Sequence, residues 1–399
     1  MAQLDYLPQP IFSRDNEQAA HSRVFTSPGK YIQGPGVLAK TGRYLSTLNL
    51  GSAGVLASAR GHGSEVPVVE ASLSHHEISY VRSVFGGECS LEEIEARTNE
   101  LKPQSPDCLI ILGGGKCVDA GKCIAHRLEI PAIVIPTLAS NDAPCSALSV
   151  VYAPSGVFEG VVEFFPSNPA MVIVDTEIVA KAPERFLVAG MGDAMATWYE
   201  AKVCINNPDA VNMLGSRPTL AACAMGEICA HTLYADSLEA VKSVHSGNPT
   251  EELERVVEAN TLLSGLGFES GGLAAAHAVA QAYTNLPVVE ENYLHGEMVA
   301  MGLLTQLSLE NDEVEARRAT EYFASVGLPV HYGQLSLDHR DSGVLDLVVE
   351  ATLNFGALSN LPFDVSPESL RDALLSANDL GINIAQQAGD EAYRRLQAS

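Results

Sequence analysis

One aspartate near the middle of this 399-residue chain and two histidines in its second half lie among unusually small and apolar neighbours. Asp193 stands in AGMGDAMATWYE, His277 in GGLAAAHAVAQAY and His295 in NYLHGEMVAMGLL. An ionisable group buried in such surroundings without a partner is costly, and a divalent metal ion offsets that cost. One carboxylate and two imidazoles form a donor set that suits zinc and leaves a coordination position open for water or substrate.

Each of these residues also has a purely structural interpretation. A histidine in an apolar helix is commonly a core residue bonded to a carbonyl, and Asp193 could be an N-terminal helix cap. The short-spaced HExxH pattern is absent from the sequence. Residue types and surroundings alone therefore leave both interpretations open.

A glycine turn in the first half could hold a phosphate. In CLIILGGGKCVDAGKCIA, an apolar run precedes Gly113, Gly114, Gly115 and Lys116, and a helical pattern follows. Glycines let the backbone approach a ligand, and the start of the following helix offers free N–H groups. The turn has neither the Walker spacing nor GxGxxG, and packing alone can also require such glycines.

Small polar residues gather in the segment 136–152, directly after another apolar run. Ligands bind α/β sheets at the carboxyl ends of strands, where this segment is expected to lie. A solvated loop is the alternative. The polar residues are Thr137, Ser140, Asn141, Asp142, Ser146 and Ser149.

The length and the pattern predict two domains after a loose arm of residues 1–24. Between residues 25 and 183, strand-like and helical stretches alternate, which predicts an α/β domain with a parallel sheet covered on both faces. The predicted strands are 54–58, 66–73, 108–115, 131–137 and 170–176, and the predicted helices include 89–102 and 118–129. From residue 184 to 399 we expect only helices, at 183–204, 222–244, 250–269, 296–310, 344–360 and 366–388.

Composition narrows the possible partners and the compartment. The net charge of -25 argues against a nucleic acid or an anionic membrane as partner, and a solvated acidic surface explains it. The eight cysteines form no CxxC pair and are interpreted as reduced core residues of a cytoplasmic protein. We find neither a secretory signal nor an apolar run long enough to cross a bilayer.

Several stretches together resemble the glycerol dehydrogenases, a group within the metal-dependent, iron-containing (group III) alcohol dehydrogenase family. They include GGGKCVDAGK, IPTLASNDAPCSALSVVY, GMGDAMATWYEA, GFESGGLAAAHAV and HGEMVAMGLLTQL, and they follow the family order. The resemblance covers the chain from about residue 27 and is weaker past about residue 330. It implies a fold like that of dehydroquinate synthase, with an α/β nucleotide domain and a helical domain. It also implies a homo-oligomer, an octamer.

The resemblance assigns roles to individual residues. It implies that Asp193, His277 and His295 bind zinc and that Asp142 lies beside the substrate hydroxyls. Hydride would pass from glycerol, or a similar small vicinal diol, to NAD, giving dihydroxyacetone or the corresponding hydroxyketone. The residues implied for cofactor binding are Gly114, Gly115, Lys116, Asp119, Thr137, Ser140, Ser146, Leu148 and Tyr152.

One departure concerns the choice of cofactor. The family usually ends its second strand with an aspartate that binds the adenosine ribose, but no acidic residue lies between Gly51 and Ser64 here. Ser58 stands roughly at that place, and Arg60 follows it. A missing carboxylate near an arginine favours a 2′-phosphate, so we expect NAD to work with weaker selectivity over NADP. Alternatively, Arg60 simply faces solvent.

Other activities on the same fold are a lyase of the dehydroquinate synthase type and a dehydrogenase for a phosphorylated polyol. Both need cationic groups for a substrate phosphate. Between Arg255 and Arg317 the chain has no Lys or Arg, although His277 and His295 lie there. This disfavours an anionic substrate. A catalytically dead binding protein is the third alternative, and the intact set of three ligands argues against it.

Overall fold

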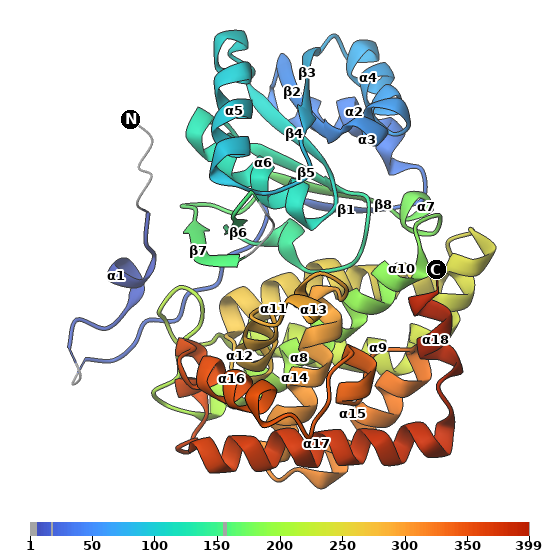
Figure 1. The fold of residues 1–399 in the computed structure, drawn as a ribbon. Helices are drawn as coiled ribbons and strands as arrows, with labels where there is room; N and C mark the ends of the chain where they lie inside the picture. The colour runs from blue at the N-terminus through green and yellow to red at the C-terminus, as the bar shows by residue number, and fades with distance from the viewer. Residues whose placement is uncertain (1–5, 17–18, 155–157, 399) are drawn as a thin grey trace.

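The computed structural model describes residues 6–16, 19–154 and 158–398, and it has a sheet half and a helical half (Figure 1). The main sheet has the strand order β1-β8-β5-β4-β2-β3, and all its strand pairs are parallel. Its strands are β1 (Tyr31–Gly34), β2 (Ser52–Ser58), β3 (Ser79–Phe85), β4 (Cys108–Gly113), β5 (Ala132–Pro136) and β8 (Met171–Asp175). The expected parallel sheet is confirmed.

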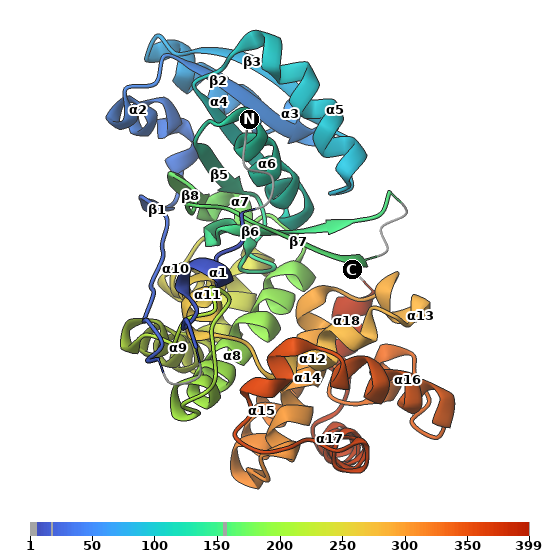
Figure 2. The same cartoon turned by 90° about the vertical axis from the view of Figure 1, so that its left-hand side faces the viewer.

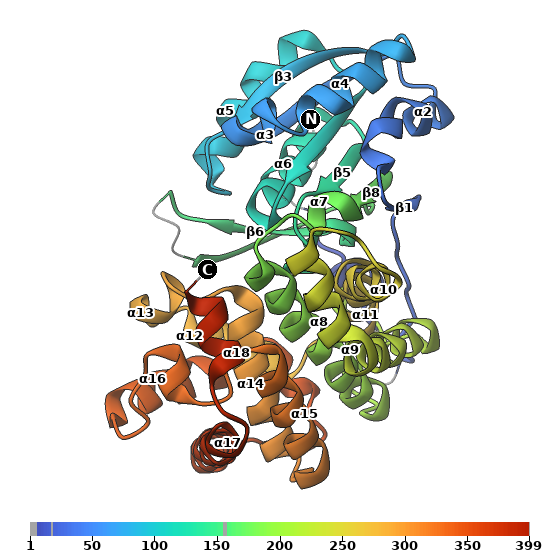
Figure 3. The same ribbon diagram turned by 90° about the vertical axis from the view of Figure 1, so that its right-hand side faces the viewer.

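The continuous apolar runs of the central strands reflect burial on both faces of the sheet. In β4, Leu109 and Ile111 pack into one core, whereas Ile110 and Leu112 pack into another. The first core includes residues of α5 (Leu91–Leu101) and α6 (Gly115–Leu128), and the second includes residues of α4 (Val66–His75). Figure 3 shows α4 and α5 with the sheet between them. Helices therefore cover both faces, as the pattern predicts.

The predicted strand at 66–73 is wrong, because this segment forms α4. Its apolar residues are nearly continuous, but Val66, Val69 and Leu73 are the ones that are fully buried, at helical spacing. Pro67 is also compatible with the first turn of a helix. The neighbouring strand is the edge strand β3, in which the polar residues Arg82 and Ser83 interrupt the apolar signal.

Two further strands lie outside the main sheet. β6 (Leu148–Tyr152) and β7 (Phe158–Phe164) pair as an antiparallel hairpin, and the sequence analysis predicted no strand in this segment. Figure 2 shows the hairpin at the border between the two halves. The short helices of the sheet half are α2 (Thr41–Leu45), α3 (Ala59–Gly63) and α7 (Thr176–Val179).

Past residue 183, the described residues form helices and connecting segments and no strand. The predicted helix at 250–269 is interrupted by a π-helical turn at Ala259–Leu263. The helices are α8 (Glu184–Asn206), α9 (Leu220–Ser246), α10 (Glu251–Glu258), α11 (Ser264–Gly271), α12 (Ala275–Tyr283), α13 (Pro287–Glu290), α14 (His295–Leu309), α15 (Glu313–Val326), α16 (Ser342–Leu353), α17 (Pro367–Ala388) and α18 (Glu391–Gln397).

The described part of the predicted loose arm is tied to the helical half. It contains the short helix α1 (Gln9–Phe12). The Gln9 amide donates to the Met213 carbonyl at 2.9 Å, and the Arg23 guanidinium donates to the Pro218 carbonyl at 2.7 Å. The rest of the arm prediction, at residues 1–5 and 17–18, lies outside the described residues.

All eight cysteines are buried and free, as expected. Burial raises the pKa of both Cys108 and Cys117 to about 12, so these thiols are unreactive at neutral pH. Within the described parts of the chain, we find no helix that is both long and apolar enough to cross a bilayer.

Candidate metal and cofactor site

Three helices of the helical half bring the predicted metal ligands together. Asp193 lies in α8, His277 in α12, and His295 is the first residue of α14. The Nε2 atoms of His277 and His295 lie 3.4 and 3.5 Å from Oδ1 of Asp193. The side chains of Asp193 and His277 are 2% and 12% exposed, whereas that of His295 is 48% exposed. The cluster is therefore buried on one side and open on the other.

Glycines explain how these helices approach so closely. A Cβ atom on Gly296, beside His295, would lie 1.7 Å from the Ala189 carbonyl oxygen of α8. A Cβ atom on Gly302 of α14 would lie 2.0 Å from the Ala276 carbonyl oxygen of α12. Only glycine fits at these two crossings, so the small residues around the ligands serve the close packing of the three helices.

The cluster has the dimensions of a metal site. Ligand atoms about 2.0–2.2 Å from one tetrahedral ion are separated by roughly 3.3–3.6 Å, which matches both distances to Asp193. Both carboxylate oxygens of Asp193 are buried, and neither accepts a well-formed hydrogen bond from the described residues. A buried carboxylate in this position needs a cation. These three residues could therefore hold a divalent metal ion.

Charges within the cluster support the same interpretation. Burial alone would raise the pKa of Asp193, but His295 and His277 lower it below the ordinary range. For His277, burial acts to lower the pKa, but Glu200 and Asp193 outweigh burial and raise it well above normal. The site thus favours a carboxylate together with positive charge, supplied by protons or by a metal.

Glu200 is a member of this cluster that the sequence analysis missed. It lies on α8 two turns after Asp193, and its side chain is fully buried. Its Oε2 atom lies 2.6 Å from Nδ1 of His277. The spacing of seven residues, which places it on the same helix face as Asp193, was the available signal.

Asp142 approaches the metal cluster from the sheet half. It follows β5, and its Oδ2 atom accepts a hydrogen bond from the Ser264 hydroxyl of α11 at 2.8 Å. Burial, and then the charge of Asp193, raise the pKa of Asp142 well above normal. Asp142 is thus close enough to the cluster to sense its charge, as its predicted place beside the substrate requires.

The predicted cofactor residues gather at the carboxyl edge of the sheet. Ala57 pairs with Leu112 and Gly113 with Pro136, so β2, β4 and β5 end side by side. The residues at or directly after these ends are Ser58, Gly114, Gly115, Lys116, Thr137 and Ser140. A Cβ atom on Gly115 would lie 2.4 Å from the Asn141 amide nitrogen, so the glycine turn and the loop after β5 touch.

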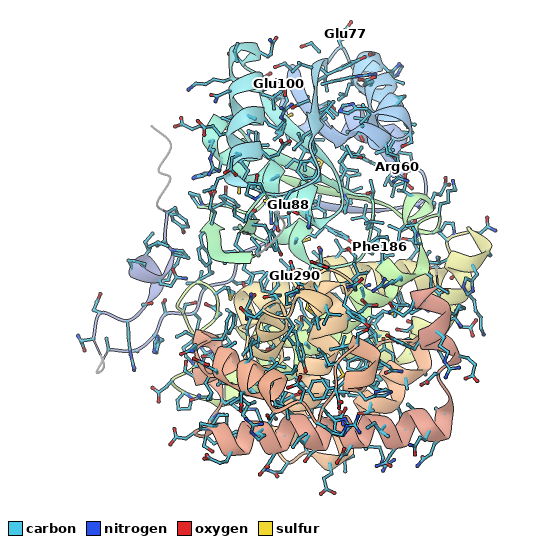
Figure 4. All side chains as sticks on the ribbon, viewed as in Figure 1. Arg60, Glu77, Glu88, Glu100, Phe186 and Glu290 are labelled. Atoms are coloured by element: carbon cyan, nitrogen blue, oxygen red, sulfur yellow. The ribbon has the colours of Figure 1, made fainter. Side chains whose placement is uncertain are left out.

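Lys116 and Tyr152 connect the glycine turn to the hairpin. The Lys116 ammonium group lies 5.5 Å from the centroid of the Tyr152 ring and 2.5 Å from Oε2 of Glu88. Figure 4 shows Glu88 and Glu290 on opposite sides of the border between the halves. Burial raises the pKa of Glu290. Among the neighbouring charges, Lys116 has the largest effect and lowers this pKa, and Glu88 follows and raises it. The turn therefore faces the helical half.

Asp119, Ser146 and Leu148, which the resemblance also assigns to the cofactor, are buried. Asp119 pairs with the buried Lys122 at 3.0 Å, and Ser146 is fully buried. The Lys122 ammonium group also donates to the Ala143 carbonyl at 2.9 Å and to the Leu148 carbonyl. These residues hold the loop and the hairpin in place, and contact of their side chains with a cofactor stays a prediction.

Ser58 lies at the end of β2, where the sequence places it. Its hydroxyl accepts a hydrogen bond from the Gly61 N–H at 3.2 Å and caps α3. Arg60 is 77% exposed, and its guanidinium lies 3.7 Å from a carboxylate oxygen of Glu65. Arg60 is thus near the carboxyl edge of β2, on the surface (Figure 4).

A sheet half and a helical half that meet near a carboxylate–imidazole cluster are typical of metal-dependent dehydrogenases. Comparison with known proteins shows the family to which this chain belongs. The model of the family "iron-containing alcohol dehydrogenase" matches residues 28–176. A glycerol dehydrogenase of Escherichia coli O6:H1 is 42% identical over 92% of this chain and 99% of its own length. The chain belongs to the iron-containing alcohol dehydrogenase family and is an oxidoreductase.

Two other proteins bear on the activity and the fold. A glycolaldehyde reductase of Halobacterium salinarum is 38% identical over 90% of this chain and 98% of its own length. The crystal structure of glycerol dehydrogenase from Schizosaccharomyces pombe has a TM-score of 0.86 at 36% identity, covering 95% of this chain and 94% of that one. The similarity therefore extends over both halves of the fold.

Proposed function

We propose that this protein oxidises glycerol, or a similar small vicinal diol, to dihydroxyacetone or the corresponding hydroxyketone, reversibly and with NAD as hydride acceptor. The observation that carries the proposal is the buried Asp193 carboxylate, which lacks a hydrogen-bond partner among the described residues and has two imidazoles 3.4 and 3.5 Å away. Relatives named glycerol dehydrogenase support the substrate.

Asp193, His277 and His295 would hold a zinc ion, which supplies a Lewis acid for the alcohol oxygen when bound. Two imidazoles and one carboxylate are also a ligand set of non-haem iron. We favour zinc because hydride transfer to nicotinamide requires no change in the oxidation state of a metal. Metal analysis of the purified protein, followed by reconstitution with zinc or ferrous iron, distinguishes the two.

Because a cation held by the neighbouring cluster would favour the ionised form of Asp142, this carboxylate would accept a hydrogen bond from the hydroxyl next to the reacting carbon. Its second oxygen is held by Ser264, which fixes the orientation of the carboxylate. A vicinal diol has a second hydroxyl for this contact, and a simple alcohol does not. This arrangement favours polyols over monohydric alcohols.

The cofactor would lie along the carboxyl edge of β2, β4 and β5. Its pyrophosphate would approach the start of α6, where Gly114 and Gly115 leave backbone N–H groups accessible. Ser58 stands at the end of β2 in place of an acid, so a 2′-phosphate meets no carboxylate from that position. We propose that NAD is used and that NADP is also accepted.

The acidic segment around the two histidines argues against phosphorylated substrates, and thus against a lyase of the dehydroquinate synthase type. No Lys or Arg occurs from residue 256 to residue 316. Arg185, which reaches this segment, is paired with Glu297 at 2.8 Å. A neutral polyol fits these surroundings better than a phosphate ester.

Reduction of a small hydroxyaldehyde is a second candidate function. The similarity to a glycolaldehyde reductase over nearly the whole chain favours it. The same metal and cofactor sites would serve either substrate, because a hydroxyaldehyde also pairs a reacting carbon with a neighbouring hydroxyl.

A spectrophotometric assay at about 340 nm tests both candidates, since reduced nicotinamide absorbs there. We expect glycerol with NAD to increase the absorbance, and dihydroxyacetone with NADH to decrease it. A much higher kcat/KM for glycolaldehyde than for dihydroxyacetone would favour the second candidate. No turnover of any of these substrates would contradict both.

We also propose a homo-oligomer, an octamer as in the family that the chain resembles, and a cytoplasmic location. Exposed apolar side chains on α9 support association, because Leu220 is 77%, Ile228 54% and Leu238 52% exposed. Light scattering coupled to size-exclusion chromatography tests the oligomeric state. A monomer at micromolar concentration would contradict it.

A further inference from the structure

Glu200 is a fully buried carboxylate whose two oxygens have different partners. Oε2 lies 2.6 Å from Nδ1 of His277. Oε1 accepts hydrogen bonds from the backbone N–H groups of Ala274 at 2.7 Å and His277 at 3.0 Å. No Lys or Arg among the described residues forms an ion pair with Glu200, so its strongest partner is the imidazole of a candidate metal ligand.

The directions of these hydrogen bonds determine where the His277 proton lies. A backbone N–H can only donate, and an ionised carboxylate can only accept. Nδ1 of His277 must therefore carry the proton that it shares with Glu200. The other ring nitrogen, Nε2, lies 3.4 Å from Oδ1 of Asp193, so it is the nitrogen that a metal ion would bind, in place of any proton there.

We propose that Glu200 is a positioning residue for metal binding: it fixes the ring orientation of His277 and the tautomer that carries its proton on Nδ1. The inference rests on the proposed metal site. A ligating histidine bound in this way keeps its ring orientation and its Nδ1 proton before the metal arrives, and loss of such a partner weakens metal affinity by about 10–100-fold.

The alternative is that Glu200 merely caps the start of α12. Ala274 is the N-cap residue of that helix and His277 lies in its first turn, and their N–H groups would otherwise lack partners. Both roles use the same side chain, so an alanine substitution would remove both and distinguish nothing.

Glutamine separates the two roles because its amide has one acceptor and one donor. If the Gln oxygen accepts from the Ala274 and His277 backbone, the NH2 group faces Nδ1 and donates to it. The helix cap then persists, but the His277 proton moves to Nε2 and blocks metal binding. The reverse orientation would set the NH2 group against two N–H donors. Glu200→Gln therefore keeps the cap and reverses the tautomer.

The experiment compares zinc affinity in four proteins after chelator treatment: wild type, Glu200→Gln, His277→Ala and Glu269→Gln. Glu269 is a matched control, since it is also a buried glutamate that accepts from a backbone N–H, that of Ala147 at 2.8 Å. Its other oxygen accepts from the Asn168 amide at 2.6 Å rather than from a metal ligand. Zinc dissociation constants come from competition with a chromophoric chelator, and circular dichroism reports folding.

We expect Glu200→Gln to bind zinc about 10–100-fold more weakly than wild type while its metal-free form unfolds at a similar temperature. Glu269→Gln should bind zinc within about threefold of wild type. If His277→Ala loses zinc but Glu200→Gln does not, the positioning role is wrong. If zinc binding is equal in wild type, His277→Ala and Glu200→Gln, the metal site itself is wrong and the proposed function fails with it.

A measurement on the wild type makes the test independent of the folding of any variant. Cobalt(II) replaces zinc, and an imidazole that binds it through Nε2 shows an exchangeable, strongly shifted Nδ1–H proton resonance. We expect such a resonance in the wild type, and we expect it to exchange slowly with solvent, because Glu200 holds the proton in a buried site. Absence of this resonance in the cobalt-loaded wild type would overturn the proposal.

Discussion

Asp142 is the residue through which the sheet half reaches the substrate in this account. Asp142→Asn removes the charge but keeps an oxygen for Ser264, so the loop should keep its shape. We expect kcat/KM for glycerol to fall by about 10–100-fold, the equivalent of roughly 1.5–3 kcal/mol for a hydrogen bond to a charged group. The affinities for zinc and NAD should stay nearly unchanged. A comparable loss of NAD affinity, measured by fluorescence titration, would instead place Asp142 in the nucleotide site.

The prediction that the enzyme accepts NADP as well as NAD depends on Ser58. Aspartate caps helices as well as serine does, so Ser58→Asp should preserve the start of α3. We expect the ratio of kcat/KM for NAD to that for NADP to rise about tenfold or more, because the new carboxylate repels a 2′-phosphate and accepts from the ribose hydroxyls. The measurement is the ratio for both cofactors in both proteins.

Ser79→Asp is the matched control for charge. Ser79 begins β3 at the opposite end of the sheet, beside Ser52 of β2. The same added charge should leave the ratio unmoved there. If the ratio does not change in Ser58→Asp either, or if the wild type already rejects NADP strongly, the interpretation of the β2 end is wrong.

At the residue level, the sequence predicted which side chains meet but not all of their partners. Asp193, His277 and His295 stood out because each is ionisable in Gly- and Ala-rich surroundings. Glu200 did not, because a glutamate in WYEAK has the local appearance of an exposed helical residue. Its burial results from the packing of α12 against α8, a contact between segments 77 residues apart in the chain.

Among the elements, the crossing of α14 and α8 bears directly on the position of His295. Gly296→Ala would place a methyl group 1.7 Å from the Ala189 carbonyl oxygen. We expect destabilisation of about 1–3 kcal/mol from overpacking, and a weaker zinc affinity, because α14 must move away and carry His295 with it. Thermal unfolding and chelator competition measure the two effects.

Gly356→Ala is the control for this substitution. It lies in the same half, and a Cβ atom there meets nothing within 4 Å. We expect a change within about 0.5 kcal/mol and an unaltered zinc affinity. Equal effects of the two substitutions would contradict the account of the helix crossing.

The sequence predicted the elements that are buried on both faces, but it did not predict the type of an element that is buried on one face only. β4 and β5 are buried on both faces, and their apolar runs identify them. The run at 66–73 is also largely apolar but buries one face of a helix, and a short apolar run does not distinguish the two structures. The β6–β7 hairpin was missed because Ser149 interrupts the apolar residues of β6 and small polar residues precede this strand.

At the scale of the whole molecule, the net charge of -25 has a measurable consequence. Like charges repel most strongly at low salt, where the screening length is about 30 Å at 0.01 M, compared with about 3 Å at 1 M. We expect the unfolding midpoint to rise by several degrees over this range. Sodium chloride and tetramethylammonium chloride should act alike if screening is the cause. A midpoint that falls with salt would show that attractive ion pairs dominate.

Both halves of the molecule contribute to the proposed reaction, and we propose that it requires a metal ion at the Asp193 cluster. The direct test measures NADH formation from glycerol, at equal protein concentration, in metal-free protein before and after addition of one equivalent of zinc. We expect activity to be lost on metal removal and restored by zinc in the wild type, whereas Asp193→Ala stays inactive and folded. Full activity in wild-type protein that contains no measurable metal, or restoration of Asp193→Ala by zinc, would contradict the account.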